Sequence, residues 1–202
     1  MVQSMLAQSI PQAQHFSIAD GPQVYNPELR CVVVDLMSIS RLLNGSRMCF
    51  RLEPYAFQDI LVSVCYRLLH HHPAAGDRPE NDNENACHLG LLAFMTTLLF
   101  QHGRSQRLSY KLLAEKLRNG IRDTSSNVTM EETIFLWLPF IGGISVFRAV
   151  DRPWLLPLIK TRLFALNIDS WRIARDKIRK LPWIDAVHDR PGRELWQAMV
   201  YA

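Results

Sequence analysis

The chain has 202 residues, 48% of them hydrophobic and 21% charged, a composition typical of a globular protein with one sizeable core. The formal net charge of +4 does not by itself indicate nucleic-acid binding, because nucleic-acid-binding proteins concentrate their basic residues on one face. None of the four cysteines belongs to a Cys-x-x-Cys pair, which excludes a zinc knuckle or a binuclear zinc cluster within these residues and predicts free thiols.

The first segment, residues 1–26, is rich in Gln, Ser and Pro and has little periodicity, so we expect a loose lead-in. It has neither the basic leader nor the apolar core of a secretory signal. Two apolar runs, residues 90–100 and 133–147, are shorter than the roughly 20 residues that cross a bilayer. They predict buried helices and no membrane association, with residues 27–202 forming a single domain.

Two amphipathic helices are expected next. The first begins at Pro27 and ends at the Asn-Gly pair 44–45, and its three-and-four spacing and length favour a helix over a strand at residues 32–34. The second, over residues 54–70, has the same spacing. The segment 73–85, PAAGDRPENDNEN, predicts an exposed loop between two helical hairpin arms, because it is rich in turn residues.

A strongly apolar helix follows this loop. Asn83 or Asn85 is suited to cap it, and it is predicted to run to His102. Apolar side chains cover nearly every face of Leu89–Leu99, so we place this helix at the centre of the core. A shorter amphipathic helix is predicted over residues 109–120, where an Asn-Gly pair ends it.

Proline and glycine interrupt the next two predicted helices. Residues 129–132 form a Thr-x-x-Glu capping box that starts the first of them. This helix should kink or break near Pro139 and the glycine pair 142–143, because proline removes a donor and clashes with the preceding turn. The second helix, over residues 153–167, should kink or restart at Pro157.

A basic helix comes next, capped by Asp169 or Ser170 and stopped by Pro182. Its basic side chains could touch phosphate, as in a nucleic-acid surface. A solvated charged face over a tryptophan core fits better, because Trp171 lies on the apolar stripe and several aspartates dilute the positive field.

The chain is predicted to end in two short helical pieces, residues 183–189 and 193–199, hinged at Pro191-Gly192. The predicted architecture is therefore all-α, an irregular multi-helix bundle or array of about seven to nine helices. We interpret the last stretch as a terminal clasp, with three buried side chains (Trp183, Ile184 and Trp196) and three that tie the hinge by hydrogen bonds (Asp185, His188 and Arg193).

The sequence predicts no catalytic, cofactor or metal site. The adjacent histidines 70–72 point in different directions on a helix and lack a nearby carboxylate or cysteine at ligand spacing. Asp185, His188 and Asp189 share a helical face that could orient a general base, but no nucleophile accompanies them. No glycine-rich loop suited to a nucleotide phosphate precedes a helix.

The order of features from about residue 133 onward resembles the C-terminal part of the fungal-specific transcription factor domain, which lies downstream of zinc binuclear cluster modules. The ending WID, then HD, PGR and LW is the most specific part. The residues that carry this structural signature are Trp137, Gly142, Gly143, Trp154, Trp171, Trp183, Ile184, His188, Asp189, Pro191, Gly192 and Trp196.

The resemblance implies a helical regulatory region of a fungal nuclear regulator, without catalytic residues, that acts in transcription through protein contacts and controls a biosynthetic gene set. The chain contains no six-cysteine cluster, so direct DNA binding is not expected, and the helical region is shorter than in typical members. If covering helices are lacking, the apolar faces of Leu89–Leu99 would be left for a protein partner or self-association. The alternative is a helical accessory protein or an unrecognised enzyme of a fungal secondary-metabolite pathway, working in the cytoplasm rather than the nucleus.

Overall fold

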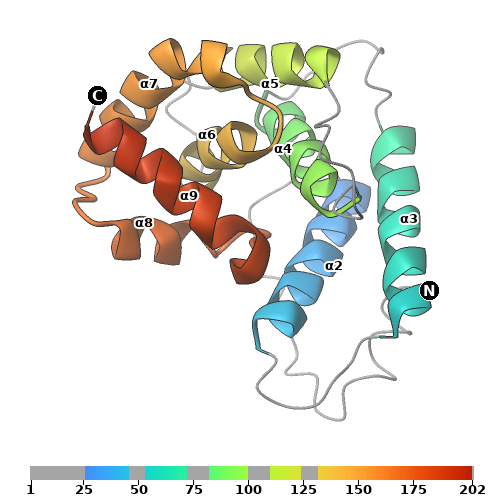
Figure 1. Ribbon diagram of the computed structural model, residues 1–202. Coiled ribbons are helices and arrows are strands. Elements are labelled where there is room, and N and C mark those ends of the chain that lie inside the picture. Colours follow the sequence, from blue (N-terminus) through green and yellow to red (C-terminus); the bar gives the residue numbers. More distant parts are fainter. Residues whose placement is uncertain (1–25, 46–52, 72–81, 100–109, 124–131, 202) are drawn as a thin grey trace.

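The computed structural model describes residues 26–45, 53–71, 82–99, 110–123 and 132–201 (Figure 1). Within these ranges the fold is all-α, as predicted, and contains no strand. The elements are α2 (Pro27–Asn44), α3 (Pro54–His71), α4 (Asp82–Leu99), α5 (Lys111–Asp123), α6 (Glu132–Ser145), the short 3-10 helix η3 (Ala149–Asp151), α7 (Arg152–Ala165), α8 (Trp171–Ile178) and α9 (Asp185–Val200).

The predictions for the lead-in before Asn26, for the threonine of the capping box and for a helix end at His102 concern residues outside these ranges. The predicted bounds of α2 and α3 are confirmed to within a residue. Asn26 caps α2, since its side-chain oxygen accepts from the backbone N–H groups of Glu28 at 2.8 Å and Leu29 at 3.3 Å.

Helix α4 begins earlier than predicted, so the expected loop over 73–85 is wrong at its C-terminal end. Asn83 and Asn85 lie inside the first turns of α4 instead of capping it. Glu84 in this turn contacts His71 at the end of α3, with 3.2 Å between Oε1 and Nε2. A tertiary contact thus outweighs the local preference of these residues for turns.

Helix α5 continues through the Asn-Gly pair 119–120, where we predicted its end. The added turn buries Ile121 completely, and Gly120 faces Leu89 of α4. The free energy of burying the Ile121 side chain exceeds the weak preference of an Asn-Gly pair for a helix end, so the helix continues.

Helix α6 is also continuous, so of the predicted kink or break near Pro139 the break is wrong. Proline has no N–H, so the carbonyl of Phe135 loses its partner within the helix. The buried side chain of Arg162, on α7, replaces this donor: its Nη1 donates to the Phe135 carbonyl at 2.5 Å. Its Nη2 donates at 3.0 Å to the carbonyl of Ile121, in the last turn of α5, where carbonyls lack helical partners.

Burial of the Arg162 guanidinium lowers its pKa to about 10, so the group is charged at neutral pH. Its ring contact reinforces the junction, because the guanidinium carbon lies 3.8 Å from the centre of the Phe135 ring. One side chain therefore joins the end of α5, the middle of α6 and α7.

Two further prolines lie inside helices where we predicted interruptions. Helix α7 runs through Pro157 without restarting, and α9 runs through Pro191, so the predicted hinge between two short pieces is wrong. Gly192 explains why α9 holds together here. A Cβ atom on it would lie 2.8 Å from the Trp171 ring and 3.0 Å from the Trp183 ring, so the helix backbone is packed directly on two indoles.

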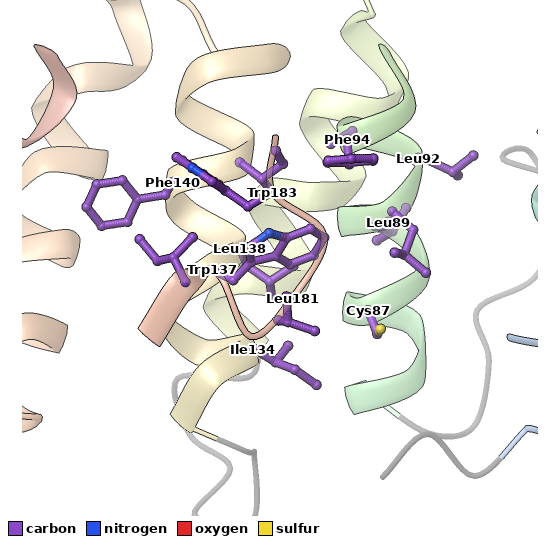
Figure 2. Packing of buried hydrophobic residues seen from close by; sticks show 14 of the residues in the cluster. Cys87, Leu89, Leu92, Phe94, Ile134, Trp137, Leu138, Phe140, Leu181 and Trp183 are labelled. Atoms are coloured by element: carbon purple, nitrogen blue, oxygen red, sulfur yellow. The ribbon is translucent and has the colours of Figure 1, made fainter. Parts of the chain in front are cut away.

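The core centres on the crossing of α4 and α6, and α6 also contacts α5, α7, α8 and α9. Gly90 of α4 allows the close approach, because a Cβ atom there would lie 2.4 Å from the Trp137 ring. Figure 2 shows Trp137 and Leu138 of α6 with Leu181 and Trp183 beside α4. The central position predicted for α4 is confirmed, but the idea that its apolar faces are left uncovered is wrong, since Leu89, Phe94 and the other described apolar residues of α4 are buried.

Whether Arg162 replaces the hydrogen-bond donor that Pro139 removes from the Phe135 carbonyl can be tested by combining two substitutions. We expect Arg162→Met to lower the free energy of unfolding by about 3 kcal/mol, because two buried carbonyls lose their donors. In a Pro139→Ala background, the loss should be smaller by about 1 kcal/mol, because the new amide can serve the Phe135 carbonyl. Urea unfolding followed by circular dichroism measures both, with Lys160→Met on the exposed side of α7 as the control. Equal losses in the two backgrounds would contradict the compensation.

A second test concerns the α4–α6 crossing. Gly90→Ala should destabilise the protein by about 2–3 kcal/mol, because the new methyl group overlaps the Trp137 ring and Leu138. Gly120→Ala is the matched control: its nearest neighbour would be Leu89 Cδ1 at 3.5 Å, so this substitution should stabilise by about 0.5–1 kcal/mol. Thermal unfolding of the two variants measures this difference. Similar melting temperatures would contradict the close packing of Gly90 against α6.

Candidate functional site

The tryptophans of the structural signature fall into separate groups in space. Trp171 is at the centre of one group, with its ring centre 6.5 Å from that of Trp183 and 6.2 Å from that of Trp196. Gly192 packs against the rings of Trp171 and Trp183. Trp137 joins this group through Pro182: the Trp137 indole N–H donates to the Pro182 carbonyl at 3.1 Å. These four tryptophans therefore lie at a junction of α6, α8 and α9, where Trp137 and Trp183 are buried and Trp171 and Trp196 are half-buried.

The second group surrounds Trp154 at the start of α7. Its ring lies 5.1 Å from that of Phe147, which packs in turn on Gly142. Its indole N–H donates to Asp151 at 3.2 Å, and Asp151 also pairs with Arg118 of α5. Gly143 faces neither group, because its neighbours are Leu195 and Leu155. These contacts fasten α5, α6 and α7 together and expose no reactive group.

Asp189, a residue of the predicted acid-base face, is bound to its surroundings. Its carboxylate accepts from the Trp183 indole at 2.8 Å and from Arg175 Nε at 2.8 and 2.9 Å. Burial raises the pKa of Asp189, but the hydrogen bonds from Arg175 and Trp183 and the nearby positive charges outweigh it and lower the pKa overall. Asp185 pairs with Arg175 at 2.9 Å and with Arg179 at 3.0 Å. Both carboxylates therefore fasten α9 to α8.

His188 is buried, and both ring nitrogens have partners. Nδ1 accepts from the Ile184 N–H at 2.8 Å, and Nε2 lies 2.8 Å from the Thr97 hydroxyl of α4. Because Nδ1 is an acceptor, the ring proton is on Nε2 and is donated to Thr97, which donates to the Phe94 carbonyl. Burial lowers the pKa of His188 to about 3. The imidazole is neutral at pH 7 and fixes α9 to α4.

The predicted clasp is confirmed in part. Trp183 and Ile184 are buried, as expected, and Trp196 is half-buried. The predicted hydrogen bonds across a hinge are wrong, because α9 is continuous: the side chains of Asp185 and His188 bind other elements, and Arg193 is exposed. The sequence reasoning missed Asn44, which holds the start of the clasp. Its Nδ2 donates to the Trp183 carbonyl at 2.7 Å, and its Oδ1 accepts from the Asp185 N–H at 2.8 Å.

A half-open pocket of about 390 Å³ lies where the ends of α2 and α8 meet. Ser40, one of its lining residues, is buried and its hydroxyl has no hydrogen-bond partner. Arg41, Arg179 and Lys180 bring positive charge, and Asp176 brings negative charge. The positive charge is partly offset, because Arg179 pairs with Asp185 and both helices present their negative C-terminal ends here. The pocket therefore has polar and charged walls, and its Ser40 hydroxyl is not hydrogen-bonded to a base.

Among the residues that the structure describes, the remaining sequence candidates contact other side chains, and His72 lies outside those ranges. The basic residues of α8 are largely paired, since Lys177 contacts Glu132 at 3.2 Å in addition to the pairs of Arg175 and Arg179. His71 contacts Glu84, and His70 stacks on Tyr66. In the ranges that the structure describes, no group of His, Cys, Asp and Glu is placed to hold a metal ion.

The most unusual surface is on α3. Four large apolar side chains on its outer side are exposed, with fractions of 75% for Tyr55, 57% for Val62, 69% for Tyr66 and 53% for Leu69. Their spacing of three, four or seven residues places them on one line along the helix, which we call the α3 stripe. Helix α3 lies at the edge of the molecule and packs against α2 and α4 with its other side (Figure 1).

No family model, curated protein or solved structure matches this chain. Among the helices that the structure describes, none has both the length and the apolar character needed to cross a membrane.

The state of His188 predicts a pH dependence of stability. A histidine with an ordinary pKa near 6.5 when unfolded and about 3 when folded binds fewer protons in the folded state. Its contribution to stability is complete above pH 6.5 and is lost as the pH falls toward 3. Between pH 7 and pH 4 the loss from this residue should approach about 3 kcal/mol.

Urea unfolding at several pH values should therefore show a steeper fall below pH 6.5 for the wild type than for His188→Asn, which cannot titrate. His70→Gln, at an exposed position on α3, serves as the control and should keep the slope of the wild type. Parallel curves for the wild type and His188→Asn would show that the buried imidazole does not control this dependence.

Proposed function

We propose that the protein is a non-catalytic helical domain of the fungal transcription-regulator type, which acts in transcriptional regulation through protein contacts. The observation that carries this proposal is the α3 stripe, in which four exposed apolar side chains lie in one row on a single helix. Other exposed apolar side chains, such as Val150 and Phe164, lie on other elements. Rows such as the α3 stripe are typical of surfaces that bind other proteins, because removing each exposed apolar side chain from water lowers the free energy of the complex.

The polar groups of the C-terminal segment support the non-catalytic part of the proposal. Asp185, His188 and Asp189 are the residues most suited to acid-base chemistry, and each holds α9 to another part of the fold. A general base must reach the proton that it removes from a substrate. These three side chains are engaged in structural hydrogen bonds, which fits the role that the family resemblance implies for this segment.

The contact partner in this proposal is a protein and not DNA. Sequence-independent DNA binding needs a face of unpaired Lys and Arg side chains. Three of the cations on the basic helix α8 are already paired with carboxylates, namely Arg175, Lys177 and Arg179. The domain would act in the nucleus, in the control of a biosynthetic gene set, as the resemblance implies.

The pocket between α2 and α8 favours a second candidate function. A helical accessory protein of a fungal secondary-metabolite pathway, working in the cytoplasm, would need a polar concave site, and this pocket has polar and charged walls. It is half-open, its positive charge is partly offset, and its Ser40 hydroxyl has no hydrogen-bonded base, so it supports binding better than a reaction.

Transcript measurements in the native host distinguish the two functions. Deleting the gene should change the transcripts of a defined gene set, and the wild-type gene should restore them. Tyr66→Glu should fail to restore them, because it places a charge on the α3 stripe. Phe164→Glu is the matched control, since Phe164 is exposed on α7, away from the α3 stripe. Unchanged transcripts together with an altered metabolite profile would contradict the regulator and favour the accessory protein.

A further inference from the structure

We infer that the α3 stripe pairs with the α3 stripe of a second copy of this chain, antiparallel and around a two-fold axis at Val62. This inference rests on the proposed function, in that it names the partner of the same surface. Tyr55, Val62 and Leu69 are spaced by seven residues, about two helical turns, so they lie nearly on one line. Val62 lies at the middle of the 18 residues of α3.

The sizes of the side chains fit this arrangement. With Val62 on the axis, Tyr55 lies level with Leu69 of the second copy, and Gln58 lies level with Tyr66, because the members of each pair are equally far from Val62. The smallest side chain of the stripe then lies where the two helices come closest, and larger ones fill the space on either side. An isologous contact requires a surface of this kind, which is complementary to itself.

The charges fit as well. Asp59 is the exposed acidic residue beside the stripe within α3. Antiparallel pairing separates the two copies of Asp59 by six residues, which is about 9 Å along the helix axis. A parallel pair would place the same carboxylates directly opposite each other. Antiparallel pairing also brings Glu53, just before α3, near His70 of the second copy, and opposes the two helix dipoles.

A second copy fits this surface because Tyr55 and Leu69 are equally far from Val62 and because antiparallel pairing keeps the Asp59 carboxylates apart. The interface is small. One helix face contributes less than the roughly 800 Å² per partner of a standard stable complex, so the pairing should be weak and dependent on concentration.

Charged substitutions on the axis provide a sharp test. Val62→Asp and Val62→Lys each place two like charges at the closest point of the homodimer and should weaken self-association at least tenfold. An equimolar mixture of the two variants should associate again, because the opposite charges then meet. Val62 is more than half exposed, so circular dichroism should show that both variants fold like the wild type.

Sedimentation velocity over a range of concentrations measures the outcome. Val150→Asp is the matched control, because Val150 is an exposed valine in η3, and this variant should associate like the wild type. A wild type that is monomeric at every concentration would overturn the pairing, as would variants that still form homodimers or a mixture that stays monomeric. If Tyr66→Glu nevertheless abolishes transcriptional rescue, self-pairing alone has failed and the α3 stripe binds a different protein.

Discussion

The continuity of α6 depends on one buried side chain from another helix. Pro139 leaves the Phe135 carbonyl without its helical donor, and Arg162 of α7 supplies one while also binding the last turn of α5. A buried guanidinium is costly to desolvate, and it is retained here because it satisfies two carbonyls that would otherwise be unpaired. The other helices of the core depend on this junction, because α6 contacts α4, α5, α7, α8 and α9.

The C-terminal segment completes this core from the other side. Asn44, Thr97 and Arg175 come from three different helices, and each binds the stretch from Trp183 to Asp189. The aromatic, acidic and imidazole groups of this stretch resemble a reactive site in the sequence, but each is engaged in holding helices together. The apolar outer side of α3 presents a row of exposed side chains to a partner, which is why protein contact is the function that we favour.

Much of the fold could be predicted from local patterns. Helices α2 and α3 begin at prolines and keep three-and-four apolar spacing, and their bounds agree with the prediction. Less of the candidate site could be predicted from the sequence. Trp183 and Ile184 were recognised as buried, but Asn44 looked like an ordinary helix end, and nothing in its neighbourhood indicates a partner about 140 residues away. The exposed side of α3 was missed because apolar spacing alone does not show which apolar residues a helix buries.

The sequence by itself determined the helical class, the approximate places of the helices and the central role of α4, because these follow from periodicity, capping residues and continuous apolar runs. The tertiary structure decided whether helices continue through Pro139, Pro157 and Pro191. It also decided which polar groups form hydrogen bonds and ion pairs between helices. A proline or an Asn-Gly pair changes local stability by up to a few kcal/mol, and burial or a long-range donor can offset that amount. Such partners come from distant parts of the chain, so only the folded arrangement reveals them.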